Sequence, residues 1–181
     1  MLISDSHGFI FIHVGKAAGT SIQRALQAYA RPRTDAIWRH RLVLLGRGEN
    51  SLFETELALR RSSHHGAVEL ALVDLRDREA MKRAVGRARP QIVLHAAAHK
   101  HVPLMEANIA EAVLNNVEGT DNLLRVSERC RVGRLVLISS DKAVNPTSVM
   151  GVTKRIAEQL VQRAAERARR PYLAVRFGNV L

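Results

Sequence analysis

Short apolar runs alternate with longer amphipathic stretches along this chain. The runs are rich in leucine and β-branched residues, which is typical of strands buried in a parallel sheet. They cover residues 9–14, 42–45, 68–73, 91–94, 134–138 and 172–177. The stretches between them place apolar residues at helical spacing, so the chain is expected to consist of repeated strand–helix units.

This pattern predicts an α/β fold with a Rossmann-like, doubly wound parallel sheet in three layers. The usual strand order of a Rossmann sheet, 3-2-1-4-5-6, is expected for it. The 181 residues suffice for one domain with a proper core and are too few for two full-sized domains. One helix is expected at residues 51–61 with Ser51 as its cap, and another after the cap residue Asp77. A third is expected between residues 103 and 128, broken near Asn108, with Val113 toward the sheet.

The charge narrows the class of ligand. The formal net charge is +11, but the basic residues are scattered along the expected helices and aromatic residues make up only 4% of the chain. Nucleic-acid binding usually needs clustered basic residues and aromatic platforms, so it is not expected. Solvated helix faces and an anionic small-molecule ligand explain the charge better.

The composition also bears on location. The apolar runs are far shorter than a membrane span, and the first residues show no secretory signal. The single cysteine, Cys130, excludes an internal disulfide, and no metal or redox role is expected for it. A cytoplasmic protein without a membrane segment in this chain is therefore predicted. The sequence leaves open whether it forms a homo-oligomer.

The richest candidate site follows the fifth apolar run. Ser140, Asp141 and Lys142 come directly after that strand, and Lys154 is expected in the first turn or so of the next helix, facing back toward them. Open α/β sheets bind ligands at the carboxyl ends of their strands. Two lysines, a carboxylate and hydroxyl groups are therefore predicted to converge there.

Other strand ends carry candidate cofactor ligands. After the second run an acidic residue would bind the 2′-hydroxyl of NAD, but this chain has Gly46 there, and the following Arg47 favours the 2′-phosphate of NADP. Arg47 as a solvated loop residue is the alternative. After the third run, Asp74 and the adjoining Leu75 are candidates for the adenine, with Asp74 accepting from its amine.

The fourth run ends in three small residues, Ala96, Ala97 and Ala98, which would let the backbone approach a ligand closely. Two further candidates, His99 and Lys100, follow at once. A metal site at histidines 95, 99 and 101 is not expected, because metal-binding histidines usually sit on a rigid element with a carboxylate or thiolate partner.

The first strand runs into a loop at residues 15–21 that contains Gly15 and Gly19 and leads into a helical pattern. Such a strand–loop–helix can cradle phosphate on backbone N–H groups, although neither the Walker nor the dinucleotide glycine pattern is present. A glycine turn without a ligand is the alternative. Residues 11–21 (FIHVGKAAGTS) resemble the donor-binding loop of carbohydrate sulfotransferases, which holds the 5′-phosphate of the sulfate donor. This resemblance covers the first 40 residues.

From about residue 41 the chain resembles the extended short-chain dehydrogenase/reductase superfamily. The resemblance is closest to its polysaccharide-biosynthesis branch of nucleotide-sugar 4,6-dehydratases, notably UDP-N-acetylglucosamine 4,6-dehydratase. Ordered motifs carry it at residues 44–51 (LLGRGENS), 95–106 (HAAAHKHVPLME), 116–120 (NVEGT), 139–154 (SSDKAVNPTSVMGVTK) and 176–181 (RFGNVL). The resemblance implies a UDP-sugar substrate and a bound NADP or NAD.

The resemblance also implies catalytic roles. Hydride leaves sugar C4, Lys142 as base removes the acidified C5 proton, Asp141 as acid helps the C6 hydroxyl leave as water, and hydride returns to C6. Ser140 would bond the C4 oxygen, and Lys154 would hold the nicotinamide ribose. Met150 stands where related enzymes carry a tyrosine that deprotonates the C4 hydroxyl, so the identity of the C4 base is left open.

The remaining implied roles concern binding. Residues 96–98 would line the cofactor, His99 and Lys100 would lie near the sugar, and Asn179 would contact the substrate phosphates.

Two departures from the family pattern point to a hybrid or a fragment. The glycine-rich first turn is replaced by the sulfotransferase-like segment, and the substrate-binding region expected after Leu181 is missing. We therefore expect a first unit at residues 1–40, a partial NAD(P)-binding domain at residues 41–181, and reduced or absent turnover for the chain alone. The alternatives are a sulfotransferase-like nucleotide-binding protein and a non-catalytic basic binding module.

Overall fold

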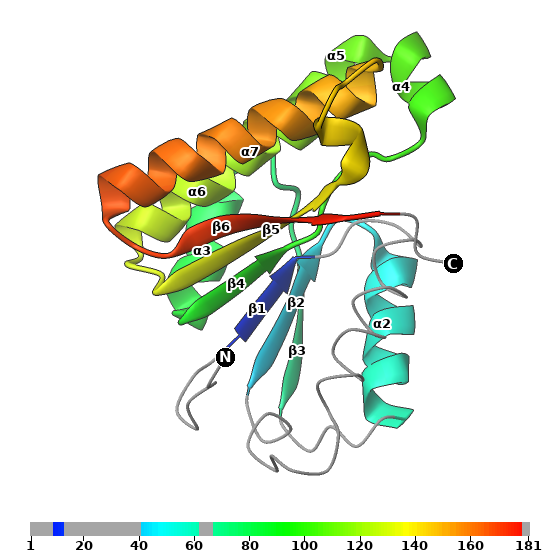
Figure 1. The fold of residues 1–181 in the computed structure, drawn as a ribbon. Helices are drawn as coiled ribbons and strands as arrows, with labels where there is room; N and C mark the ends of the chain where they lie inside the picture. The colour runs from blue at the N-terminus through cyan, green and yellow to red at the C-terminus, as the bar shows by residue number, and fades with distance from the viewer. Residues whose placement is uncertain (1–8, 13–40, 62–66, 179–181) are drawn as a thin grey trace.

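The computed structural model describes residues 9–12, 41–61 and 67–178. Its centre is a six-stranded parallel sheet with the order β3-β2-β1-β4-β5-β6 (Figure 1). The strands are β1 (Phe9–Ile12), β2 (Leu42–Gly46), β3 (Val68–Leu72), β4 (Ile92–His95), β5 (Arg134–Ser140) and β6 (Tyr172–Phe177). The predicted fold class and strand order are confirmed.

The first strand lies in the middle of the sheet. Phe9 is opposite Leu42 of β2 on one side and opposite Ile92 of β4 on the other. The segment that resembles a sulfotransferase loop thus begins with the strand that joins both halves of the sheet. The loop with Gly15 and Gly19 lies outside the described residues, so its phosphate-binding role and the boundary at residue 40 stay predictions.

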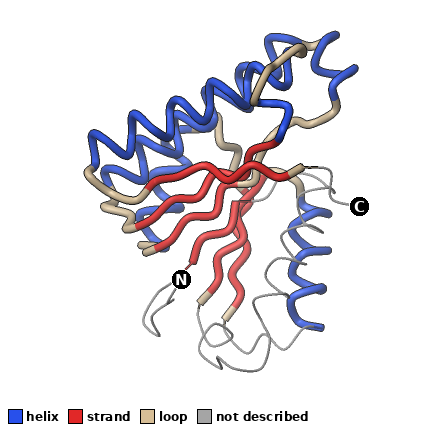
Figure 2. Tube along the Cα trace, viewed as in Figure 1, coloured by secondary structure: helices blue, strands red, loops and turns tan. Residues whose placement is uncertain are grey.

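Helices cover both faces of the sheet, which gives the three predicted layers (Figures 1 and 2). Among the described helices, α3, α6 and α7 lie on one face and α2 on the other. The bounds are α2 (Glu49–Arg61), α3 (Arg78–Ala88), α4 (Val102–Ala107), α5 (Ile109–Val113), the π-helical η2 (Leu114–Glu118), α6 (Gly119–Arg129), the 3-10 turn η3 (Asp141–Ala143) and α7 (Val149–Ala168). None of the helices in the described ranges is long and apolar enough to cross a membrane.

Apolar burial holds each helical layer to the sheet. The larger cluster lies on the α3, α6 and α7 face and includes Met81 of α3, Leu123 of α6 and Val161 of α7, which pack with Leu45, Leu135 and Leu137 of the strands. On the other face, Leu52 and Leu59 of α2 pack with Leu42 and Leu44 of β2. Buried strands with short apolar runs are the feature that the sequence pattern predicted.

The helix ends agree with the sequence in part. Asp77 accepts a hydrogen bond from the Ala80 N–H and caps α3 as predicted, and the long helix breaks at Asn108. The Ser51 cap is wrong, because α2 begins at Glu49 and the Ser51 hydroxyl donates to the Gly48 carbonyl. Val113 is also misplaced by the prediction: it is 42% exposed, since the break and the π-helical turn change which face meets the sheet.

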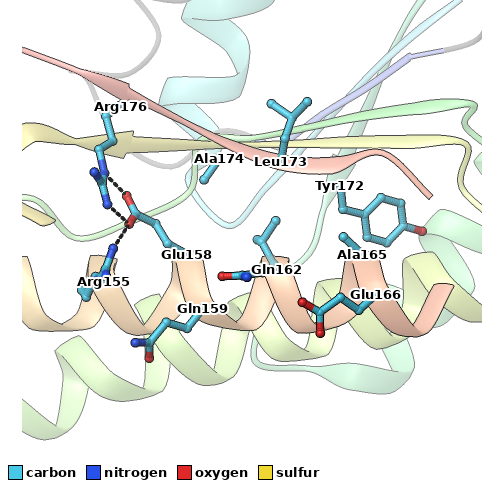
Figure 3. Close-up of a pocket in the computed structure, with 11 residues that line it drawn as sticks. Arg155, Glu158, Gln159, Gln162, Ala165, Glu166, Tyr172, Leu173, Ala174 and Arg176 are labelled. Carbon is cyan, nitrogen blue, oxygen red and sulfur yellow. Dashed lines mark hydrogen bonds and ion pairs between the residues drawn. The ribbon is translucent and has the colours of Figure 1, made fainter. Parts of the chain in front are cut away.

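A buried carboxylate ties α7 to the last two strands. Glu158 accepts from the Ser139 hydroxyl of β5 at 2.6 Å and from Arg176 of β6 at 2.8 and 2.7 Å. Arg155 approaches the same carboxylate at 3.3 Å (Figure 3). Arg176 is the first cause of the lowered pKa of Glu158, so the carboxylate stays ionised at neutral pH. A cavity of about 580 Å³ runs beside this group between α7 and β6, and none of the predicted site residues lines it.

We expect Glu158→Gln to lower the free energy of unfolding by about 2 kcal/mol, because it removes the buried charge that accepts hydrogen bonds from Ser139 and from the exposed Arg176. Urea denaturation at neutral pH measures the change. Glu166→Gln on the same helix is the matched control, because Glu166 is exposed and should change stability by less than about 0.5 kcal/mol. Equal effects of the two substitutions would show that the link between α7 and the strands does not stabilise the fold.

Candidate functional site

The predicted site residues in the described ranges lie at the carboxyl ends of the strands or at the start of α7. Arg47 follows β2, Asp74 follows β3, residues 96–100 follow β4, and residues 140–142 end or follow β5. Strand order reverses at β1, and open α/β sheets bind ligands in the crevice beside such a reversal. The residues that make polar contacts form two groups, one after β2, β3 and β4 and one after β5.

The first group is a network of alternating charges, which we call the arginine–carboxylate network: Arg47, Asp74, Arg76, His99 and Glu111. Arg76 binds both oxygens of Asp74, with a shortest distance of 2.6 Å, and both oxygens of Glu111 at 3.2 and 3.1 Å. Arg47 lies 3.7 Å from Asp74 and 3.6 Å from Glu111, and its Nη2 lies 3.3 Å from His99 Nε2. The same His99 nitrogen is 3.2 Å from Glu111 Oε1.

Both carboxylates of this network are ionised at neutral pH. The hydrogen bond from Arg76 is the main cause of the lowered pKa of Asp74, and the hydrogen bond with His99 is the main cause for Glu111. The pKa of Arg76 is raised, chiefly by Asp74. Two guanidinium groups and two carboxylates therefore balance each other at the edge where the sequence predicts the adenosine end of a cofactor.

The loop after β4 is held by a buried amide. Asn116 Oδ1 accepts from the His99 backbone N–H at 2.8 Å, and its Nδ2 donates to the His99 carbonyl at 3.0 Å. The Asn116 amide also donates to Thr153 Oγ1 of α7 at 3.0 Å. Asn116 lies in the π-helical turn η2, and such turns often occur at functional sites. It fixes the loop of residues 96–101 relative to α7.

His95 is fully buried at the end of β4. The Thr120 hydroxyl donates to the Asn116 carbonyl at 2.7 Å, so its oxygen accepts from His95 Nε2 at 2.9 Å and the proton of the neutral ring is on Nε2. Burial, with the nearby charge of Lys154 as a second cause, lowers the pKa of His95 to about 3. The imidazole is therefore neutral at physiological pH. Within the described residues its Nδ1 has no hydrogen-bond partner.

The second group is the turn after β5. Ser140 Oγ donates to Asp141 Oδ1 at 3.0 Å and accepts from the Lys142 N–H at 3.1 Å. Lys142 Nζ lies 3.3 Å from the same Asp141 oxygen, and both side chains are about half exposed. The hydrogen bond from Ser140 is the first cause of the lowered pKa of Asp141, followed by the one from Lys142. The turn packs on α7 at Gly151, where a Cβ would lie 2.5 Å from the Lys142 carbonyl.

Lys154 lies in the second turn of α7 and is 7% exposed. Its Nζ donates to the Ile138 carbonyl of β5 at 2.9 Å, two residues before Ser140. Burial lowers its pKa to about 8. Within the described residues, no hydrogen bond or ion pair joins Lys154 to Asp141 or Lys142. The two lysines and the carboxylate were predicted to converge. In the structure Asp141 pairs with Lys142, whereas the buried Lys154 bonds separately to the Ile138 carbonyl of β5.

Three further candidates have packing roles or lie elsewhere. Met150 is buried with Met105 and Ala112 in a small apolar cluster, and its thioether cannot titrate. The side chain of Leu75 is 2% exposed and packs in the main core, so a cofactor could contact only its backbone. Asn179 lies outside the described residues, so its contact with substrate phosphates stays a prediction.

Two residues of the arginine–carboxylate network were missed by sequence reasoning. Arg76 stands two residues after Asp74, which was a usable signal for a local ion pair. Glu111 gave no signal, because its contacts with Arg47 and Arg76 join parts of the chain that are far apart in the sequence. The ring of His99 contacts Arg47 and Glu111, whereas the side chain of Lys100 is exposed.

The structure also separates the three histidines that might suggest a metal site. His95 is buried against Thr120, and His99 binds the arginine–carboxylate network. Within residues 9–12, 41–61 and 67–178, no group of three or more His, Cys, Asp or Glu could hold a metal ion.

The described residues fit a nicotinamide dinucleotide at three places. Ala96 and Ala97 are buried small residues at the end of β4, beside the reversal of strand order, where backbone can approach a ligand. Arg47 and Asp74 offer a cation and an acceptor at the ends of β2 and β3, and the ammonium of Lys154 lies at the end of β5. The predicted phosphate loop is among the residues that the structure does not describe.

Known proteins resemble this chain over most of its length. The family described as "Polysaccharide biosynthesis protein" matches residues 19–181. The probable polysaccharide biosynthesis protein EpsC of Bacillus subtilis is 42% identical over 92% of this chain and 27% of its own length. An inverting UDP-N-acetylglucosamine 4,6-dehydratase of Campylobacter jejuni is 28% identical over 78% of this chain and 42% of its own length. The chain thus spans about a quarter to two-fifths of these relatives.

Solved structures share the fold. Pen from Bacillus thuringiensis has a TM-score of 0.77 and 26% identity, with 99% of this chain and 52% of that chain covered. DesIV, a dTDP-glucose 4,6-dehydratase from Streptomyces venezuelae crystallised with NAD and TYD bound, has a TM-score of 0.75 and 19% identity, with 93% and 54% covered. The chain spans about half of these structures.

We expect Lys154→Met to raise the free energy of unfolding at pH 7 by about 1–2 kcal/mol, because it removes a buried ammonium at the loss of one hydrogen bond. The pKa of Lys154 falls from 10.5 in the unfolded chain to about 8 in the fold. Between these pH values the folded protein binds fewer protons, so raising the pH favours the native state by up to roughly 3 kcal/mol. Native lysine should therefore regain stability relative to methionine from pH 8 to 10.5.

Urea denaturation at pH 7, 8.5 and 10 measures this difference, with Lys82→Met on exposed α3 as the matched control. If the stability difference between Lys154→Met and the native chain does not change with pH, the fold does not bury Lys154 in its charged form.

Proposed function

The chain belongs to the polysaccharide biosynthesis protein family, and on that premise we propose that it is the nucleotide-binding part of a UDP-sugar 4,6-dehydratase or epimerase. The substrate class is a UDP-N-acetylhexosamine, and the cofactor is a nicotinamide dinucleotide. The 4,6-dehydratase of Campylobacter jejuni supports the substrate, and the NAD in DesIV supports the cofactor. The chain spans only part of these proteins, so exchange of the sugar C5 proton tests whether this chain alone is active.

One observation carries the proposal: the pairing of Asp141 with Lys142 on a turn packed against α7, next to a buried lysine. Burying Lys154 costs free energy, and a structural helix would gain more from an apolar residue at that position. An acid–base pair at a strand end beside an ammonium suits proton transfer next to a bound ribose. No described feature favours sulfate transfer in the same way.

The chain's own residues would do the following work on a keto-sugar. Ser140 donates to the sugar O4, Lys142 in its neutral form takes the C5 proton, and Asp141 in its acid form gives a proton to the leaving C6 hydroxyl, which departs as water. Lys154 holds the ribose hydroxyls of the cofactor by hydrogen bonds. A bound nicotinamide would supply the hydride acceptor for C4 and the hydride donor for C6, and Lys142 would return its proton to C5 when the hydride reaches C6.

The protonation states of Asp141 and Lys142 must change for this chemistry. In the structure the pair stabilises a carboxylate and an ammonium, whereas catalysis requires a carboxylic acid and an amine. Transfer of one proton from Lys142 to Asp141 would produce both required forms at once, and removal of solvent by the sugar would favour the neutral pair. Substrate binding therefore has to desolvate a turn that is now half exposed.

The finer assignments rest on the sequence. Arg47 supports NADP over NAD, and Asn179, His99 and Lys100 are the candidates for the sugar and its phosphates. A cytoplasmic location and a homo-oligomer are part of the same proposal.

Binding of a nicotinamide dinucleotide is the first test. We expect NAD(H) or NADP(H) at millimolar concentration to raise the melting temperature of the full chain by several degrees, since a ligand at one hundred times its Kd stabilises the native state by about 2.7 kcal/mol. Differential scanning fluorimetry measures the shift, with UDP-N-acetylglucosamine added separately and together with the cofactor. The absence of any shift with all four dinucleotides would reject the cofactor site.

Proton transfer is the second test. With UDP-N-acetylglucosamine and the bound cofactor, the chain should exchange the sugar C5 proton for solvent deuterium, and Lys142→Met should slow that exchange by at least about a hundredfold. Mass spectrometry of the recovered sugar measures the exchange. Lys82→Met is the control and should exchange at the native rate. If both ligands bind and the native chain shows no exchange, the catalytic assignment of this turn is wrong.

A further inference from the structure

Glu111 is the carboxylate of the arginine–carboxylate network that neither the sequence motifs nor the proposed function uses. Its backbone belongs to α5 rather than to a strand-end loop, and its side chain is about one-third exposed. One of its oxygens, Oε1, lies 3.6 Å from Arg47, 3.2 Å from Arg76 and 3.2 Å from His99. A single carboxylate oxygen thus faces a nitrogen from the loop after each of the strands β2, β3 and β4.

The other carboxylate of the network is already fully engaged. Arg76 binds both oxygens of Asp74 through its side chain, and its backbone N–H donates to Oδ1. Asp74 is therefore paired chiefly with Arg76, which also binds both oxygens of Glu111. The charge of Arg47 is balanced by what remains, which is the charge of Glu111 together with a more distant share of Asp74.

This balance decides how the edge responds to a phosphate. A 2′-phosphate next to Arg47 would bring about two negative charges to a place where two carboxylates already match two guanidinium groups. It would have to draw Arg47 from Glu111 and would then lie beside a carboxylate whose remaining partners are Arg76 and His99. A 2′-hydroxyl brings no charge and carries no such cost. The electrostatic potential at Arg47 therefore depends on Glu111 of α5 as well as on the residues at the strand ends.

We propose that Glu111 is a specificity-determining residue for the dinucleotide, and that its charge lowers the preference of the site for a 2′-phosphate over a 2′-hydroxyl. The inference rests on the proposed function, because it assumes that the adenosine end binds beside Arg47. Arg47 by itself favours a 2′-phosphate. The carboxylate of Glu111 reduces that preference, which the identity of the strand-end residue does not reveal.

The same oxygen links cofactor choice to the sugar-side loop. His99 is held by Asn116 through its backbone and by Glu111 through its ring. When a 2′-phosphate draws Arg47 away, Glu111 retains Arg76 and His99 as its partners. Its effect on the phosphate is therefore electrostatic and does not require the loop to move.

Two small nucleotides test the inference on the full chain. Adenosine 2′,5′-bisphosphate carries the 2′-phosphate, and 5′-AMP lacks it but is otherwise the same. Isothermal titration calorimetry gives the ratio of the two Kd values for the native chain and for Glu111→Gln, which keeps the shape and removes the charge. We expect the substitution to increase the relative affinity for the bisphosphate by about fivefold at low salt, and by less at 0.5 M salt where screening is stronger.

Glu118→Gln in the neighbouring turn η2 is the matched control and should leave the ratio unchanged, because Glu118 is exposed and has no hydrogen-bond or ion-pair partner in the described part of the chain. Glu111→Ala serves as a second variant and should shift the ratio in the same direction. An unchanged ratio in both Glu111 variants, with both nucleotides bound, overturns this inference and leaves the proposed cofactor site intact. Failure of every variant and of the native chain to bind either nucleotide overturns the cofactor site and this inference together.

Discussion

The parallel pairing of β1 with β2 on one side and with β4 on the other is the interaction on which the rest of the structure depends. Strand order reverses at this strand, so successive crossovers leave in opposite directions and place helices on both faces. The same reversal opens the crevice at the carboxyl ends of the strands. Residues 9–12 therefore position both the core and the candidate site, although they form only one short strand.

The chain concentrates its buried polar groups at that edge. Lys154, His95 and Asn116 are each buried, and each costs free energy that an apolar residue would not. Asn116 recovers the cost by satisfying both backbone groups of His99, whereas Lys154 keeps a depressed pKa and one carbonyl partner. A fold that depended only on stability would place leucine or alanine there, as it does elsewhere around α6 and α7. Polar burial at a ligand-binding edge is the pattern expected of a functional site.

His99 joins the two halves of the site. Its backbone is held by Asn116, which also contacts α7, and its ring contacts Arg47 and Glu111 at the ends of β2 and α5. The turn of Asp141 and Lys142 packs on the first turn of α7 through Gly151. The group near the predicted adenosine and the group near the predicted sugar are thus connected through one loop and one helix. The chain belongs to the polysaccharide biosynthesis protein family and shares the fold of the solved structures reported above, of which it spans about half.

The fold class, the strand order and the positions of most strand ends followed from the sequence alone, because buried parallel strands leave short apolar runs and strand-end residues follow them directly. The break at Asn108 and the cap at Asp77 were also readable, since they depend on local backbone chemistry. The partners of Glu111, the burial of Lys154 against the Ile138 carbonyl and the neutrality of His95 were decided only by the tertiary structure. Each depends on how elements distant in the sequence pack together, and neither the spacing of residues nor their composition records that.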